Sequence, residues 1–186
     1  MAQTRNVAVI VGSLRAESLN RKTALALARM APESLRLEIV EIDGLPLYNQ
    51  DLDDDPPQEW LDFRDRIRGF DAVLFVTPEH NRSLPAALKN AIDIGSRPYG
   101  SSAWAGKPAG VVSVSPGAIG GFGANHHLRQ SLVFLDMPAM QQPEAYFGGA
   151  GDYFDEAGDL KSEKTRQVMQ RFIDSYAAWV EKILAG

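Results

Sequence analysis

Hydroxyl, amide and guanidinium side chains gather near the start of the chain, in a first loop over residues 12–20. This loop follows a continuous apolar run over residues 7–11 and leads into an Ala- and Leu-rich stretch, a pattern that predicts strand, loop and helix. A helix N-terminus offers unpaired N–H groups and the positive end of a dipole, which favour a phosphate. The side chains there that could bind phosphate are Ser13, Arg15, Ser18 and Asn20.

The same polar residues are also expected in a simple turn into a helix, with Ser18 or Asn20 as the N-cap. The first loop is not a P-loop, because no Gly-Lys-Ser/Thr follows it. It is not a dinucleotide fingerprint either, because the second and third glycines are missing. From these residues alone, phosphate binding and simple helix capping both stay open.

Two further loops also follow apolar, strand-like runs. The second loop, residues 77–85, is stiffened by Pro78 and Pro85, and the third loop, residues 115–121, is rich in glycine and lets backbone approach a ligand closely. These loops could form the walls of a flat pocket beside the phosphate, which indicates FMN as the ligand. His80 could stack on its ring or act as an acid, although a lone loop histidine is more commonly a surface residue.

The sequence favours neither a metal site nor a catalytic side chain. The chain has no cysteine, which excludes a thiolate nucleophile and cysteine-ligated metals. His126 and His127 are neighbours on a predicted helix and point in different directions, and the acidic segment 51–55 lacks the glycine and glutamate of a calcium loop. We therefore expect no metal, and chemistry carried by a bound cofactor.

The composition of the chain is that of a globular protein. The 186 residues are 45% hydrophobic and 23% charged, with a net charge of −5, which argues against nucleic acid as a partner. The N-terminus is short and polar, and no run approaches transmembrane length. These features predict a single domain over residues 1–186 that resides in the cytoplasm and does not associate with membranes.

Apolar runs and helical periodicity alternate along the whole chain. The predicted strands are 7–11, 35–42, 72–76, 111–114 and 137–141. The predicted helices are 20–31, 58–68, 86–94, 124–134 and 163–184.

Five such units predict an α/β fold of the flavodoxin-like type, a five-stranded parallel sheet of order 2-1-3-4-5 with helices on both faces. The second strand alternates apolar and polar residues and the fifth contains Pro138, as expected of edge strands. The three loops follow strands one, three and four, so the fold brings them together at the carboxyl edge of the sheet.

Several motifs resemble those of the NADPH-dependent FMN reductases, most of all their bacterial chromate/quinone reductase branch with its azoreductase-like members. They are Gly-Ser-Leu-Arg at 12–15, Pro-Glu-His-Asn-Arg-Ser-Leu-Pro at 78–85 running into Leu-Lys-Asn-Ala-Ile-Asp at 88–93, and the segments 105–108 and 128–136. The similarity spans almost the whole chain.

The resemblance implies non-covalent FMN and a hydride passed from NADPH or NADH to FMN and on to a quinone, azo compound, chromate or free flavin. It also implies homodimers, often paired into homotetramers, with the flavin near the subunit interface. The phosphate would be held by Ser13, Arg15, Ser18, Leu19 and Asn20, and the isoalloxazine ring would be lined by Pro78, Glu79, His80, Asn81 and Ser83, with Ser115 and Gly117 on its other side.

The chain departs from the family in two places. The family usually has Tyr at His80. Some relatives carry Arg and Tyr at the positions of Gly123 and His126, where they join dimers together with an acid matching Glu144, and only Glu144 remains here.

Two other functions fit the same fold. A flavodoxin-type electron carrier would bind FMN without reacting with NADPH, although carriers tend to be more acidic than this chain. A non-catalytic FMN-binding or interaction module would use an aromatic partner surface, for which the candidates are Phe122, Phe147, Tyr153 and Phe154.

Overall fold

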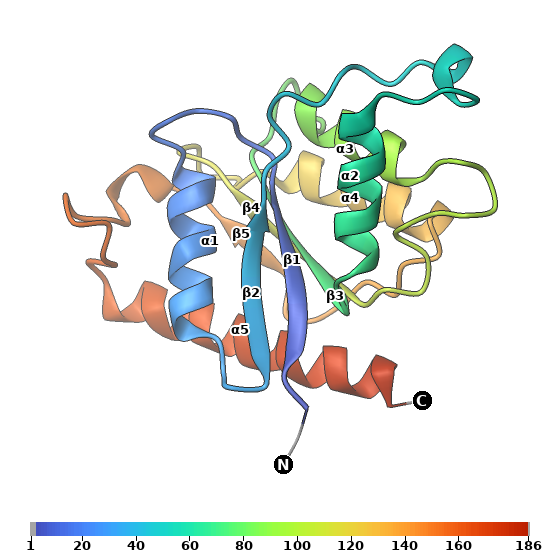
Figure 1. Ribbon diagram of the computed structural model, residues 1–186. Helices are drawn as coiled ribbons and strands as arrows, with labels where there is room; N and C mark the ends of the chain where they lie inside the picture. The colour runs from blue at the N-terminus through green and yellow to red at the C-terminus, as the bar shows by residue number, and fades with distance from the viewer. Residues whose placement is uncertain (1–2, 186) are drawn as a thin grey trace.

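The computed structural model describes residues 3–185, which form a five-stranded parallel sheet with helices on both faces (Figure 1). The strands are β1 (Arg5–Val11), β2 (Leu35–Val40), β3 (Ala72–Thr77), β4 (Ala109–Val114) and β5 (Ala145–Phe147). The helices are α1 (Leu19–Met30), α2 (Gln58–Arg68), α3 (Ala86–Gly95), α4 (Phe122–Phe134) and α5 (Glu163–Leu184), with short 3-10 turns at Gln50–Leu52 and Ala150–Asp152. The strand order β2-β1-β3-β4-β5 confirms the predicted flavodoxin-like topology.

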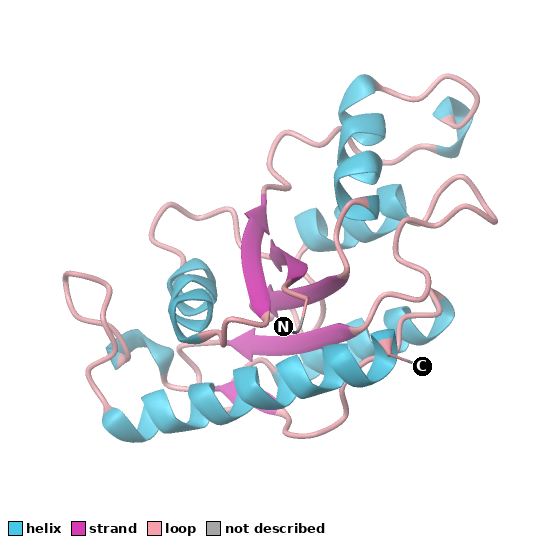
Figure 2. Ribbon diagram, turned by 60° about the horizontal axis from the view of Figure 1, so that its bottom comes forward, coloured by secondary structure: helices cyan, strands magenta, loops and turns pink. Residues whose placement is uncertain are grey.

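The buried side chains form two layers, one on each side of the sheet. Figure 2 shows the helices that cover the sheet. Helices α1 and α5 pack against one face, and α2, α3 and α4 pack against the other. Every residue of β3 and β4 is buried, which explains their continuous apolar runs. Strand β2 alternates buried and exposed residues because it pairs only with β1.

The predicted fifth strand, 137–141, is wrong, and β5 lies further along the chain. Around Pro138 the segment makes only a single parallel bridge, between Ala139 and Ala109, before the chain continues to β5 beside Val112–Val114. Met137 and Met140 are buried in opposite layers of the core, so their apolar pattern resembles that of a strand. The true strand has three residues and gives little periodicity to detect.

Two helices begin earlier than predicted, and only one of them has a local side-chain cap. The Ser18 hydroxyl accepts a hydrogen bond from the Arg21 N–H at 3.1 Å and begins α1 one residue before the prediction. Helix α4 begins at Phe122, two residues early, after Gly121 adopts a left-handed conformation with φ of 77° and contributes no side-chain cap. The N-terminus of α4 therefore needs a hydrogen-bond partner from elsewhere in the chain.

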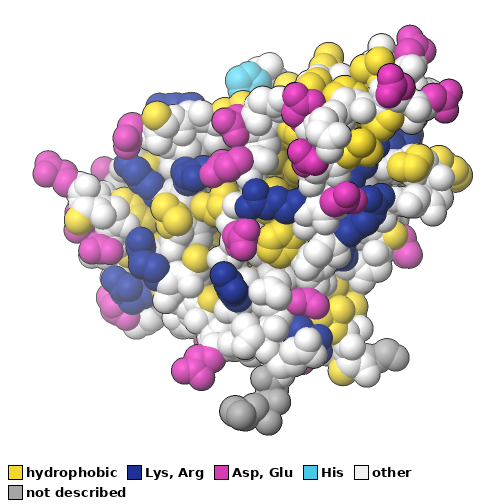
Figure 3. Space-filling view, viewed as in Figure 1, with side chains coloured by type: hydrophobic (Ala, Val, Ile, Leu, Met, Phe, Trp, Pro, Cys, Tyr) yellow, Lys and Arg dark blue, Asp and Glu magenta, His cyan; other side chains and the backbone are white. Residues whose placement is uncertain are grey.

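Acidic and basic side chains are interspersed on the face seen in Figure 3, without a continuous patch of one sign. None of the helices within residues 3–185 combines the length and the apolar composition needed to cross a membrane.

Candidate functional site

The three loops meet at the carboxyl ends of β1, β3 and β4, as the topology requires, and line a pocket of about 430 Å³. Most of the predicted site residues take part in its lining. These residues are Ser13, Arg15, Ser18, Leu19, Asn20, Pro78, Glu79, His80 and Ser115. Further lining residues, which the motifs did not single out as ligands, are Gly12, Leu14, Pro85, Ala87, Val114 and Pro116.

The first loop leaves the helix N-terminus open to a ligand. The first intrahelical hydrogen bond of α1 runs from the Lys22 N–H to the Ser18 carbonyl, so the N–H groups of Leu19 and Asn20 have no carbonyl partner within the helix. Gly12 brings the start of this loop against β3, where its N–H donates to the Val76 carbonyl at 2.9 Å. The unpaired N–H groups of Leu19 and Asn20 lie at the helix N-terminus, where an anion is favoured.

Asn20 supplies an independent sign of a ligand. Its side chain is only 4% exposed, yet its Oδ1 atom has no hydrogen-bond partner among the residues described. A buried, unpaired polar atom costs about 1–3 kcal/mol, so a bound ligand that hydrogen-bonds to Asn20 would recover stability. The nearby Arg15 side chain is exposed and makes no ion pair within residues 3–185, which leaves its guanidinium available to a phosphate.

The second loop contains a tight hairpin. His80 and Ser83 exchange backbone hydrogen bonds of 3.0 and 2.9 Å, and the two residues between them, Asn81 and Arg82, both have positive φ, at 48° and 64°. This is the pattern of a type I′ turn. The turn places Asn81 at an exposed tip outside the pocket lining, so the structure does not gather this predicted ring residue with the others.

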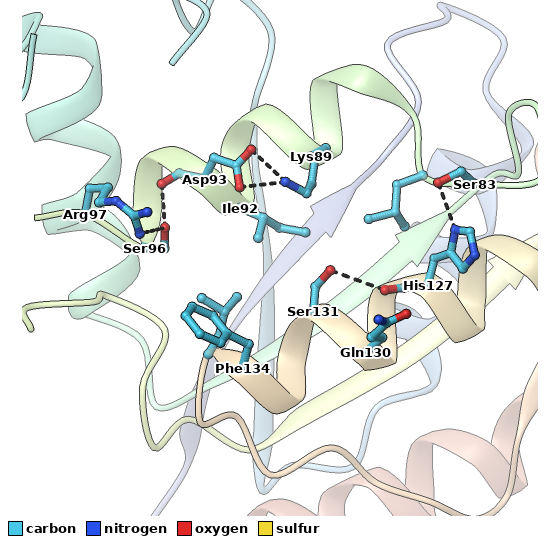
Figure 4. Close-up of a pocket in the computed structure, with 12 residues that line it drawn as sticks. Ser83, Lys89, Ile92, Asp93, Ser96, Arg97, His127, Gln130, Ser131 and Phe134 are labelled. Carbon is cyan, nitrogen blue, oxygen red and sulfur yellow. Dashed lines mark hydrogen bonds and ion pairs between the residues drawn. The ribbon is translucent and has the colours of Figure 1, made fainter. Parts of the chain in front are cut away.

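Ser83 also lies outside the pocket lining and faces a neighbouring groove of about 570 Å³ between α3 and α4 (Figure 4). Its hydroxyl is 3.0 Å from His127 Nδ1 on α4. The groove carries the Lys89–Asp93 ion pair on α3 and the Phe134 side chain on α4. The second loop therefore separates two hollows, with Pro78 to His80 lining one and Ser83 lining the other.

Glu79 directs its carboxylate at the N-terminus of α4. Oε2 accepts from the N–H groups of Gly123 at 2.7 Å and Ala124 at 3.3 Å, while Oε1 accepts from Arg82 Nη1 at 2.7 Å. Burial acts to raise the pKa of Glu79, but the hydrogen bonds from Arg82, Ala124 and Gly123 outweigh it and leave the pKa below its usual range. The sequence motif does not reveal this role, because Gly123 and Ala124 lie 44 and 45 residues away along the chain.

The third loop is held by close backbone packing. Ser115 lines the pocket, and its hydroxyl accepts from the Gly117 N–H at 3.1 Å. Gly117 itself lies outside the lining and its carbonyl accepts from Gly120 and Gly149, each at 3.2 Å. The loop is thereby tied to the segment after β5.

Three of the four aromatic candidates for a partner surface are largely withdrawn from solvent. Phe147 and Phe154 are 4% and 8% exposed, and Tyr153 is partly buried against the core that contains Phe147. Phe122 stays exposed and packs on His126, whose Nε2 is 2.9 Å from the Tyr146 hydroxyl. Within the described residues, no group of three or more His, Asp or Glu side chains could hold a metal ion.

Comparison with known proteins gives consistent matches. The family model of the NADPH-dependent FMN reductases matches residues 5–152. The chain is 66% identical to a quinone reductase from Pseudomonas putida over 182 residues, 97% of both chains, and 48% identical to a 2-hydroxy-1,4-benzoquinone reductase from a Burkholderia species over 94% of this chain and 95% of the relative. Its structure resembles the flavoenzyme NAD(P)H:(acceptor) oxidoreductase FerB from Paracoccus denitrificans, with a TM-score of 0.90, 43% identity and coverage of 96% and 98%.

Proposed function

The chain belongs to the NADPH-dependent FMN reductase family, and on that basis we propose that it is an FMN-dependent NAD(P)H oxidoreductase that reduces quinones. The observation that carries the proposal is the pocket at the carboxyl edge of the sheet. It combines an open helix N-terminus, an unpaired buried amide and an exposed arginine in the first loop with walls from the second and third loops. The N–H groups and the arginine are donors that fit a phosphate, and the Asn20 Oδ1 atom is an acceptor for a hydroxyl of the same ligand.

In this proposal the first loop binds the FMN phosphate. The N–H groups of Leu19 and Asn20 and the hydroxyls of Ser13 and Ser18 donate to phosphate oxygens, and Arg15 adds a charged, forked donor. The Ser18 oxygen already accepts from Arg21, so its hydroxyl hydrogen remains to be donated. Asn20 satisfies its unpaired Oδ1 with a hydroxyl of the bound group.

The second and third loops would orient the ring and exclude water from it. Pro78, Glu79 and His80 form one wall and Ser115 the other, with Asn81, Ser83 and Gly117 placed further out on the same loops. FMN held by these residues would supply the chemistry of hydride transfer between NAD(P)H and the acceptor. Backbone N–H groups beside the ring would stabilise negative charge there, so no side chain needs to act as a catalytic acid or base.

The acceptor class follows from the relatives, two of which are named for quinones. We extend the proposal to azo compounds, chromate and free flavin as further acceptors. NADPH and NADH would both serve as donors. Arg82 and Arg97 are the candidates for contact with a 2′-phosphate, and of these Arg82 pairs with Glu79 while Arg97 lies in the α3/α4 groove.

We further propose a homodimer formed through the faces of α3 and α4. This side carries the groove of Figure 4 and exposes Val133 and Phe134, which are 81% and 76% accessible and would be costly to leave in water. Because the groove adjoins the second loop, such a dimer places the ring near the subunit interface. Pairing of dimers into tetramers would have to use His126 and Tyr146 in place of the family's Arg and Tyr.

We propose the cytoplasm as the location, because the reaction consumes NAD(P)H made inside the cell. The proposed function is tested by steady-state oxidation of NADPH and NADH by the FMN-loaded protein with benzoquinone, chromate or an azo dye as acceptor. Turnover with benzoquinone that disappears when FMN is removed supports the proposal. A loaded protein that turns over none of these acceptors with either nucleotide contradicts it.

A further inference from the structure

Resting on the proposed function, we infer that Glu79 is a positioning residue for the flavin ring, and that Gly123 is its hydrogen-bond partner on α4. Both carboxylate oxygens of Glu79 are occupied by protein donors, so the carboxylate is not free to bind the ring. It fastens the second loop, whose residues 78–80 line the pocket, to the N-terminus of α4. Nothing local to α4 provides this cap, because Gly121 has no side chain.

Gly123 makes the contact possible by having no side chain. A Cβ atom at this position would lie 2.8 Å from the Arg82 carbonyl oxygen and 2.8 Å from Glu79 Oε2, closer than real Cβ contacts. The Arg82 carbonyl is backbone and cannot rotate away. In this chain, Gly123→Ala should therefore displace the second loop from α4, even though the variant keeps Glu79.

The Glu79–helix contact outweighs the Glu79–Arg82 ion pair. The Arg82 side chain is 73% exposed, so water and salt screen its attraction, and such pairs contribute little. The Glu79 side chain is only 12% exposed and its carboxylate accepts charge-assisted hydrogen bonds at the positive end of a helix. Removing Arg82 should therefore change loop position far less than removing Glu79.

The conformation of the hairpin depends on the contact between Glu79 and α4. Arg82 sits at φ of 64°, a conformation that costs a non-glycine residue about 1–3 kcal/mol and persists only where its surroundings enforce it. The hairpin is held to α4 at its two ends, by Glu79 to Gly123 on one side and by Ser83 to His127 on the other. With the Glu79 end released, the loop that walls the ring keeps only the Ser83–His127 contact of these two.

The test measures the FMN dissociation constant, by quenching of flavin fluorescence, for Glu79→Ala, Gly123→Ala, Arg82→Ala and the wild type. Glu181→Ala is the matched control, because Glu181 also forms a 3.0 Å ion pair, with Arg5, but lies on α5 away from the loops. We expect the dissociation constant to rise about tenfold in Glu79→Ala and Gly123→Ala, and less than about twofold in Arg82→Ala and the control. The conservative variant Glu79→Gln keeps an acceptor oxygen and should fall in between.

Hydrogen exchange of the FMN-free proteins provides a readout that does not need the cofactor. Peptides covering residues 78–83 should exchange faster in Glu79→Ala than in the control, while the strand peptides stay protected. Unchanged FMN affinity in Glu79→Ala, or unchanged exchange of the loop, overturns the inference. Failure of the wild type to bind FMN would instead contradict the proposed function, and the exchange measurement would still decide the role of Glu79.

Discussion

The backbone of Gly148 lies directly against Ala118, so that a Cβ atom on Gly148 would overlap the Ala118 carbonyl oxygen. This contact packs the third loop against the segment after β5 and fixes the wall that contains Ser115. We predict that Gly148→Ala displaces the third loop, destabilises the protein by about 1–3 kcal/mol and weakens FMN binding. Denaturant unfolding and FMN titration would measure both effects.

Gly151 offers the matched control for that substitution. A Cβ atom there meets no atom within 4 Å, so Gly151→Ala should leave FMN affinity unchanged and stability within about 0.5 kcal/mol of the wild type. Equal behaviour of the Gly148 and Gly151 variants would show that the third loop does not depend on this packing.

Arg15 is expected to act on the phosphate and on nothing else. The side chain is exposed and lines the pocket, so Arg15→Ala should raise the FMN dissociation constant about tenfold or more without changing the unfolding free energy. Riboflavin, which lacks the phosphate, should bind the variant and the wild type equally. Arg171→Ala, an exposed α5 arginine, is the control. An equal loss of FMN and riboflavin affinity would remove Arg15 from the phosphate site.

The sequence predicts most helices and the central strands, but it does not predict the fifth strand. The limits of α2 and α5 follow directly from periodicity, and β1, β3 and β4 follow from apolar runs that sheet burial on both faces requires. The fifth strand could not be recognised, because three residues carry too little pattern and the nearby Met137 and Met140 fill the core in a strand-like spacing.

Some contacts of the candidate site could be predicted from the sequence and others could not. The donors of the first loop are neighbours in sequence and were predictable from the approach to a helix N-terminus. The contacts of the second loop were not, because Glu79 meets Gly123 and Ser83 meets His127 only after β4 and α4 are in place. The motif identified Glu79 and Ser83 as pocket residues. Glu79 does line the pocket and Ser83 does not, and the side chains of both contact α4.

The dimer proposed for the α3/α4 side predicts a specific response to charge. Phe134→Asp places an uncompensated carboxylate in the apolar part of that face and should convert a dimer into a monomer at micromolar concentration. Leu25→Asp, on an exposed position of α1 at the opposite side of the sheet, should stay dimeric. Sedimentation velocity gives the result, and a dimer that survives Phe134→Asp would place the interface elsewhere.

The lowered pKa of Glu79 predicts that the stability of the protein depends on pH. Its pKa in the folded protein lies below the ordinary value of 4.5, so the carboxylate stabilises the fold above that value and the contribution is lost as the pH falls through the lowered pKa. The difference in unfolding free energy between the wild type and Glu79→Gln should therefore be constant from about pH 5 upward and shrink at lower pH. A difference that stays the same down to acid unfolding would contradict this assignment.

The measurement that bears most directly on the proposed function is an anaerobic titration of the FMN-loaded protein with NADPH, following the visible absorption of the flavin. We predict that about one equivalent of NADPH removes this absorption and that added benzoquinone restores it, because each half of the reaction moves one hydride. If FMN binds but stays oxidised in the presence of NADPH, the protein is an electron carrier that needs a partner reductase, and the proposed oxidoreductase function is wrong.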